Sequence, residues 1–84
     1  MKYKNRYGDL FTFEENEQGN VQWSGNFKHY RAGYKDNPDD PTYIDPSGGP
    51  FISIGDSMEE FGLDGIVSGF VSNENGFEIL IEKK

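Results

Sequence analysis

The chain has 84 residues, a net charge of −7 and no cysteine. This length predicts one domain over 1–84 with a radius of gyration of roughly 12 Å, and the lack of cysteine excludes a disulfide framework and a thiolate metal cluster. No segment approaches the roughly 20 apolar residues of a membrane span, and no apolar run follows the basic first residues, so we expect no signal peptide, no membrane anchor and a cytoplasmic protein.

The first third of the sequence predicts a hairpin and a further strand. Phe11 and Phe13 alternate in 10–14, Val21 and Trp23 alternate in 21–24, and the polar segment 16–20 lies between them. We expect 25–34 to continue as a strand after a bulge at Gly25. Strand alternation would then place Phe27, His29 and Arg31 on one face and Lys28, Tyr30 and Ala32 on the other.

The rest of the chain begins with a segment, 35–50, whose prolines and glycines predict a long loop, and 51–54 is a short strand. In 55–65, Ser57 and Glu60 have the spacing of a capping box before a short helical turn that Gly62 can end. Residues 65–72 and 77–84 predict a second hairpin whose turn is Asn75-Gly76 with positive φ angles. The expected fold is mainly β: a small twisted antiparallel sheet or half-barrel of about five strands with one short helical turn. Its small core and two sheet edges predict a homo-oligomer.

Charge is segregated along the chain. Residues 1–35 hold six basic and four acidic side chains, whereas 36–82 hold eleven acidic side chains and no basic one. Such a distribution steers charged partners, and the acidic excess argues against direct binding of nucleic acid, because phosphate contacts come from Lys and Arg.

No pattern in the sequence specifies a reaction, so we expect no enzyme and no catalytic residue. His29 is the single histidine, and neither a cysteine nor a Gly-x-Ser-x-Gly motif is present. Prolines interrupt the acidic segment 36–45, so its aspartates do not have the spacing of a calcium loop. We therefore expect neither a metal nor a cofactor.

The segment "YIDPSGGPFISIG" (43–55) has two open interpretations. As a strand corner, Asp45-Pro46 favours a type I turn before the two glycines. As a binding element, successive glycine N–H groups can form a concave nest for an anion. The basic stretch 27–35 supplies arginine and tyrosine side chains that suit a phosphate and an aromatic ring. The ligand-binding residues predicted from both segments are Lys28, Tyr30, Arg31, Tyr34, Tyr43, Ser47, Gly48 and Gly49.

The stretches "WSGNFKHYRAGY" and "YIDPSGGPFISIG", after an early Phe-rich hairpin, resemble the small early proteins of tailed bacteriophages that act in counter-defence, over about half of the chain. The resemblance implies a protein that disables a component in the host cytoplasm, and it carries no functional residues over.

Three functions follow as hypotheses. The leading one is a non-enzymatic module that sequesters a small phosphate-bearing, nucleotide-like ligand, at a subunit interface. The alternative is an acidic inhibitor that occupies a basic nucleic-acid-binding surface of a host protein, through Asp36, Asp39, Asp40, Asp56, Glu59, Glu60 and Asp64. The third is a small structural or assembly protein.

Overall fold

The structure is a computed structural model that describes residues 1–33, 37 and 39–83. Within these residues the chain forms eight strands and one 3-10 turn: β1 (Lys2–Lys4), β2 (Leu10–Glu15), β3 (Val21–Gly25), β4 (Arg31–Ala32), β5 (Tyr43–Asp45), β6 (Ile52–Ser53), η1 (Glu59–Phe61), β7 (Ile66–Asn73) and β8 (Gly76–Glu82). The mainly β, antiparallel class with one helical turn is as predicted. Among the described residues, no helical segment has the length and apolarity needed to cross a bilayer.

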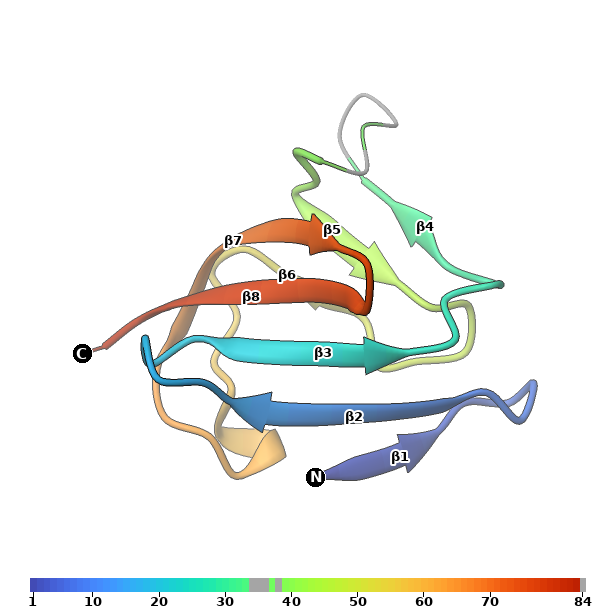
Figure 1. The fold of residues 1–84 in the computed structure, drawn as a ribbon, viewed down its shortest axis with the longest axis horizontal. Helices are drawn as coiled ribbons and strands as arrows, with labels where there is room; N and C mark the ends of the chain where they lie inside the picture. The colour runs from blue at the N-terminus through green and yellow to red at the C-terminus, as the bar shows by residue number, and fades with distance from the viewer. Residues whose placement is uncertain (34–36, 38, 84) are drawn as a thin grey trace.

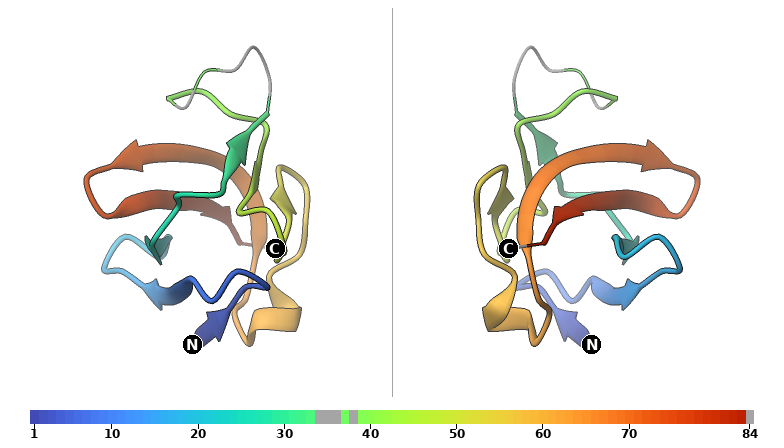
Figure 2. Two further views of the ribbon diagram at one scale, coloured as in Figure 1. Left: turned by 90° about the vertical axis from the view of Figure 1, so that its right-hand side faces the viewer. Right: turned by 90° about the vertical axis from the view of Figure 1, so that its left-hand side faces the viewer.

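The strands form two sheets rather than one (Figure 1). The larger sheet has the order β1-β2-β3-β8-β7, and the smaller one has the order β4-β5-β6. The larger sheet curls partway around the smaller one without closing into a barrel (Figure 2). The predicted hairpins, β2–β3 and β7–β8, both lie in the larger sheet.

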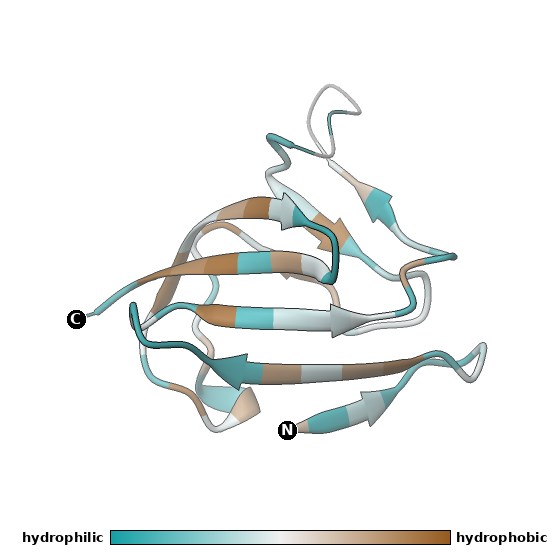
Figure 3. Cartoon of the chain, in the orientation of Figure 1, coloured by the Kyte–Doolittle hydropathy of each residue, from teal (hydrophilic) through white to brown (hydrophobic). Residues whose placement is uncertain are grey.

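The core lies between the two sheets. Apolar and polar residues alternate along much of β2, β3 and β8 (Figure 3), and the buried side chains in these strands are all apolar. Phe13 pairs with Trp23 across β2 and β3, and their rings stack with centroids 5.2 Å apart. Ile44 and Ile52 of the smaller sheet and Met58 complete the cluster. The Cα radius of gyration is 11.6 Å, close to the expected value.

The predicted strand over 25–34 is wrong. The chain turns after β3, where the Tyr30 N–H donates to the Phe27 carbonyl at 3.1 Å, and only Arg31–Ala32 is extended. Phe27 and Tyr30, which strand alternation would place on opposite faces, both pack against Phe77 with ring centroids 5.3 and 5.7 Å away. A turn allows both rings to be half-buried on the same side, and burial of two aromatic rings outweighs the local strand preference.

The predicted bulge at Gly25 is also misplaced. Gly25 pairs with Phe11 in regular register and ends β3, and a Cβ there would lie 2.5 Å from the Leu10 carbonyl oxygen. Glycine is therefore needed for the close approach of two strands. The register shift of the larger sheet lies in β7, between Val67 and Gly69.

Two further details differ from the sequence predictions, and a third agrees with them. The expected loop 35–50 contains β5, which pairs with both β4 and β6. The capping box does not form, because the N-cap is Met58 and Ser57 Oγ instead accepts from the Glu59 N–H at 3.2 Å. Gly62 does end the turn, in the left-handed conformation.

The second hairpin also turns one residue earlier than predicted. Asn73 pairs with Gly76, so the loop residues are Glu74 and Asn75. The predicted positive φ is found at Gly76, at +139°, but not at Asn75, whose N–H donates to Oδ1 of Asn73 at 3.1 Å and stabilises the turn locally.

Candidate functional site

A polar hollow of about 380 Å³ lies where the turn between β1 and β2 meets the loop between β5 and β6. Four of the predicted ligand-binding residues line it: Arg31, Ser47, Gly48 and Gly49. The remaining lining residues are Arg6, Tyr7, Asp45 and Phe51. The glycine-containing loop is therefore part of a concave surface as well as a corner between strands.

Asn5 attaches the β1–β2 turn to this loop. Its side chain is polar, yet the residue is only 6% exposed, and no other polar residue in the described part of the chain is as deeply buried. Its Oδ1 accepts from the N–H groups of Tyr7 at 3.0 Å and Asp9 at 2.9 Å, which fixes the turn itself. Its Nδ2 donates to the Pro46 carbonyl at 2.9 Å, 41 residues along the chain. Arg6 and Tyr7 are held beside the 45–51 loop as a result.

The loop has a specific backbone shape. The Ser47 N–H donates to Oδ1 of Asp45 at 2.8 Å. Ser47 has φ +50°, so the expected type I turn at Asp45-Pro46 is wrong, because that turn needs negative φ at this position. Gly48 has φ +135°, and a Cβ there would lie 2.9 Å from Cγ of Arg6. Gly48 is therefore required for contact between the loop and Arg6.

Two arginines dominate the charge of the hollow. Nη2 of Arg31 lies 3.5 Å from Oδ2 of Asp45, and the Arg31 side chain is 76% exposed. Arg6 has no carboxylate within salt-bridge distance among the described residues, and its Cζ lies 6.0 Å from the ring centroid of Tyr7. With one carboxylate against two guanidinium groups, the hollow carries a positive charge on a protein that is acidic overall.

Two exposed rings lie at this hollow, and each has a second ring behind it. Tyr7 stacks on His29 with centroids 4.4 Å apart, and Phe51 packs on Tyr43 at 4.9 Å. His29 is fixed by Asp9, whose Oδ2 lies 3.0 Å from Nδ1 of the imidazole. Because a carboxylate only accepts, Nδ1 is the nitrogen that carries the proton in this bond. The hydrogen bonds from His29 and Asn5 hold the pKa of the Asp9 carboxyl below its ordinary value.

The other predicted ligand-binding residues do not line this hollow. Lys28 is exposed on the turn after β3, near Asp9. The ring of Tyr43 packs against Phe51, which does line the hollow, and Tyr34 lies outside the described residues.

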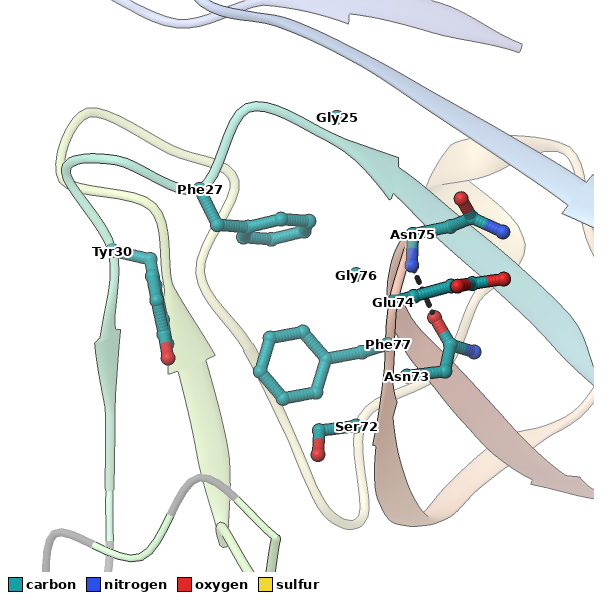
Figure 4. Close-up of a pocket in the computed structure, with 9 residues that line it drawn as sticks. All are labelled: Gly25, Phe27, Tyr30, Ser72, Asn73, Glu74, Asn75, Gly76 and Phe77. Carbon is teal, nitrogen blue, oxygen red and sulfur yellow. Dashed lines mark hydrogen bonds between the residues drawn. The ribbon is translucent and has the colours of Figure 1, made fainter.

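Tyr30 belongs to a second hollow, of about 310 Å³, beside the β7–β8 turn (Figure 4). The rings of Phe27, Tyr30 and Phe77 group on one side of it, and the side chains of Asn73, Glu74 and Asn75 lie on the other. Its lining, as far as the chain is described, contains no lysine or arginine, so it is the poorer site for an anion.

The acidic residues of the alternative hypothesis do not form one patch. Asp39 and Asp40 are exposed in the segment after β4, and Glu59 and Glu60 are exposed on η1. These two segments lie at opposite ends of the molecule (Figures 1 and 2). Asp56 is half-buried and accepts from the Ser53 N–H, Asp64 is exposed, and Asp36 lies outside the described residues.

Sequence reasoning missed Asn5, Arg6, Tyr7 and Phe51. The segment "NRYGD" (5–9) carries one local signal, an asparagine and a glycine at turn spacing, and Gly8 does adopt φ +84°. Nothing local indicates that this turn packs on residues 46–48. Comparison with models of protein families, with curated proteins and with solved structures finds no match.

Proposed function

We propose that this protein is a non-enzymatic binding module that sequesters a small phosphate-bearing ligand in the hollow between Arg6 and Arg31. The observation that carries the proposal is that two arginines from distant parts of the sequence both line one concave surface. A guanidinium group offers a planar set of donors that matches phosphate oxygens, and its charge persists at any physiological pH.

The backbone of the loop supports the same ligand class. Within the described part of the chain, no hydrogen bond uses the N–H of Gly48 or Gly49, and both glycines line the hollow. Free N–H groups beside two arginines suit an anion with several acceptor oxygens. The Ser47 N–H is already donated to Asp45 and is not part of this set.

Self-association is the second part of the proposal. Because Arg31 is 76% exposed, a ligand held by one chain alone would stay largely in water. A second subunit that covers the hollow would exclude water and strengthen the charge-assisted bonds. We expect a dimer or larger oligomer at micromolar concentration, and a monomeric mass in sedimentation with and without phosphate ligands would contradict this part.

The resemblance to phage early proteins suggests a purpose for such a site, which is removal of a phosphate-bearing signal from the host cytoplasm. Native mass spectrometry of the protein purified from the infected or expressing cell tests the proposal directly. We expect an added mass that dissociates as a phosphate-bearing compound, and we expect Arg31→Glu to lose it. A retained compound without phosphate, or one that Arg31→Glu retains equally, would contradict the proposal.

A further inference from the structure

A carboxylate is among the groups that line the proposed phosphate site. Asp45 lines the hollow together with both arginines, and its side chain is 20% exposed. Oδ1 accepts the Ser47 N–H, and Oδ2 lies 3.5 Å from Arg31. A site for inorganic phosphate alone gains nothing from this group, because a carboxylate accepts hydrogen bonds and repels a second anion.

The Arg31–Asp45 pair is easily rearranged. It is long for an ion pair, and Arg31 is largely in water, so the pair adds little stability. Arg31 can therefore turn to a phosphate at little cost, which leaves Oδ2 of Asp45 open to a donor on the ligand. The bond from Ser47 keeps the carboxylate in place during this exchange.

Two aromatic rings at the same hollow are exposed without contributing to the core. Tyr7 and Phe51 are each 54% exposed. Each has one neighbouring ring, His29 or Tyr43, that restricts its motion. Exposed rings fixed in this way are the platforms on which nucleic-acid bases stack, since every base has an aromatic face.

We infer, on the basis of the proposed phosphate site, that the ligand is a nucleoside phosphate. Its phosphate binds Arg6 and Arg31, a hydroxyl of its sugar donates to Asp45, and its base stacks on Tyr7 or Phe51. The volume of about 380 Å³ is within the range of sites for small organic ligands. Asp45 then determines specificity, because it favours a ligand with a donor beside its phosphate over inorganic phosphates.

Calorimetric titration with four probes tests the inference: adenosine monophosphate, its 2′,3′-dideoxy analogue, ribose 5-phosphate and inorganic pyrophosphate. The nucleotide is expected to bind about tenfold more tightly than the dideoxy analogue, because the latter leaves the Asp45 carboxylate unpaired. Ribose 5-phosphate is expected to bind more weakly than the nucleotide, by the contribution of base stacking.

Variants assign each effect to its residue. Asp45→Asn keeps an acceptor for the Ser47 N–H but loses the charge, and we expect it to abolish the difference between the nucleotide and its dideoxy analogue. The double variant Tyr7→Ala/Phe51→Ala is expected to bind the nucleotide no better than ribose 5-phosphate. Unfolding curves followed by Trp23 fluorescence verify that each variant folds.

The outcomes separate this inference from the function on which it rests. If all four probes bind with equal affinity, the proposed phosphate site is supported and the inference of a nucleoside phosphate is wrong. If the dideoxy analogue binds as well as the nucleotide, the role of Asp45 is wrong. If none of the four probes binds, the proposed phosphate site and the inference fail together.

Discussion

Nδ2 of Asn5 donates to the carbonyl oxygen of Pro46 at 2.9 Å, and this buried bond joins two of the segments that line the candidate site. Asn5 also accepts from two N–H groups of its own turn. The same side chain thus shapes the turn that carries Arg6 and fixes it to the loop that carries Gly48.

Asn5→Ala is expected to lower the free energy of unfolding by about 1 to 3 kcal/mol, because it leaves a buried carbonyl and two N–H groups without their partner. It is also expected to weaken phosphate binding, since Arg6 is no longer held at the hollow. Denaturant titration and calorimetry measure the two effects. The control is Asn26→Ala, which removes two exposed hydrogen bonds, one donated to Asp9 and one accepted from the Lys28 N–H. Equal stability of the two variants would show that Asn5 does not anchor the turn.

Gly48 and Gly49 form a matched pair for a second prediction. Both have positive φ, at +135° and +96°, so alanine strains the backbone at either position and is expected to cost about 1 kcal/mol of stability. A Cβ at Gly48 would also collide with Arg6, whereas a Cβ at Gly49 meets nothing within 4 Å. We therefore expect Gly48→Ala to weaken phosphate binding more than Gly49→Ala does. If calorimetry shows that the two variants lose the same affinity for phosphate, the contact between Gly48 and Arg6 does not position the arginine.

The low pKa of Asp9 predicts a pH dependence. A carboxyl with a lower pKa in the folded than in the unfolded chain stabilises the fold above its unfolded pKa, and this contribution is lost as the pH falls through the folded pKa. We expect wild-type stability to fall below about pH 4, and we expect this fall to be shallower in Asp9→Asn. Urea titrations from pH 7 to acid pH measure both curves, with the exposed Asp64→Asn as the control. If the Asp9→Asn and wild-type curves run parallel, Asp9 does not contribute.

Trp23 is the largest fully buried side chain, and its substitution tests the core. Trp23→Ala is expected to lower the free energy of unfolding by about 3 to 5 kcal/mol. The substitution removes the contacts with Phe11, Phe13 and Phe27 and leaves a cavity. Trp23→Phe retains an aromatic ring and removes an indole N–H that has no partner in the described structure, so it is expected to cost less. A loss below about 1 kcal/mol for Trp23→Ala in denaturant titration would contradict the packing described.

The elements that sequence predicts well are those whose partners are close along the chain. Strands β2 and β3 follow from the alternation of Phe11 and Phe13 and of Val21 and Trp23 across a short turn. The alternation of side chains predicts the wrong conformation after Gly25, because the positions of Phe27 and Tyr30 are set by packing against Phe77, a residue of β8. No local pattern contains that information.

In the candidate site, too, some residues can be predicted from the local sequence and others depend on contacts with distant residues. Ser47, Gly48 and Gly49 are recognisable from composition, since glycine pairs after proline mark unusual backbone. Arg6 and Tyr7 are not, because the contacts that bring them to the site, such as the bond from Asn5 to Pro46, join residues far apart in the sequence. Lys28 does not line the hollow, and the physical reason is that the turn at 27–30 separates it from Arg31, which enters β4.

The most direct test of the central claim is calorimetric titration of inorganic pyrophosphate into the wild-type protein and three charge reversals at one ionic strength. Arg6→Glu and Arg31→Glu are each expected to lose about tenfold or more in affinity, because a charge-assisted bond is replaced by repulsion. Lys28→Glu makes the same change in net charge outside the hollow and is expected to stay within about twofold of wild type, since exposed charges are screened by salt. An equal loss in Lys28→Glu, or absence of binding of both pyrophosphate and adenosine monophosphate to the wild-type protein, would contradict a phosphate site formed by Arg6 and Arg31.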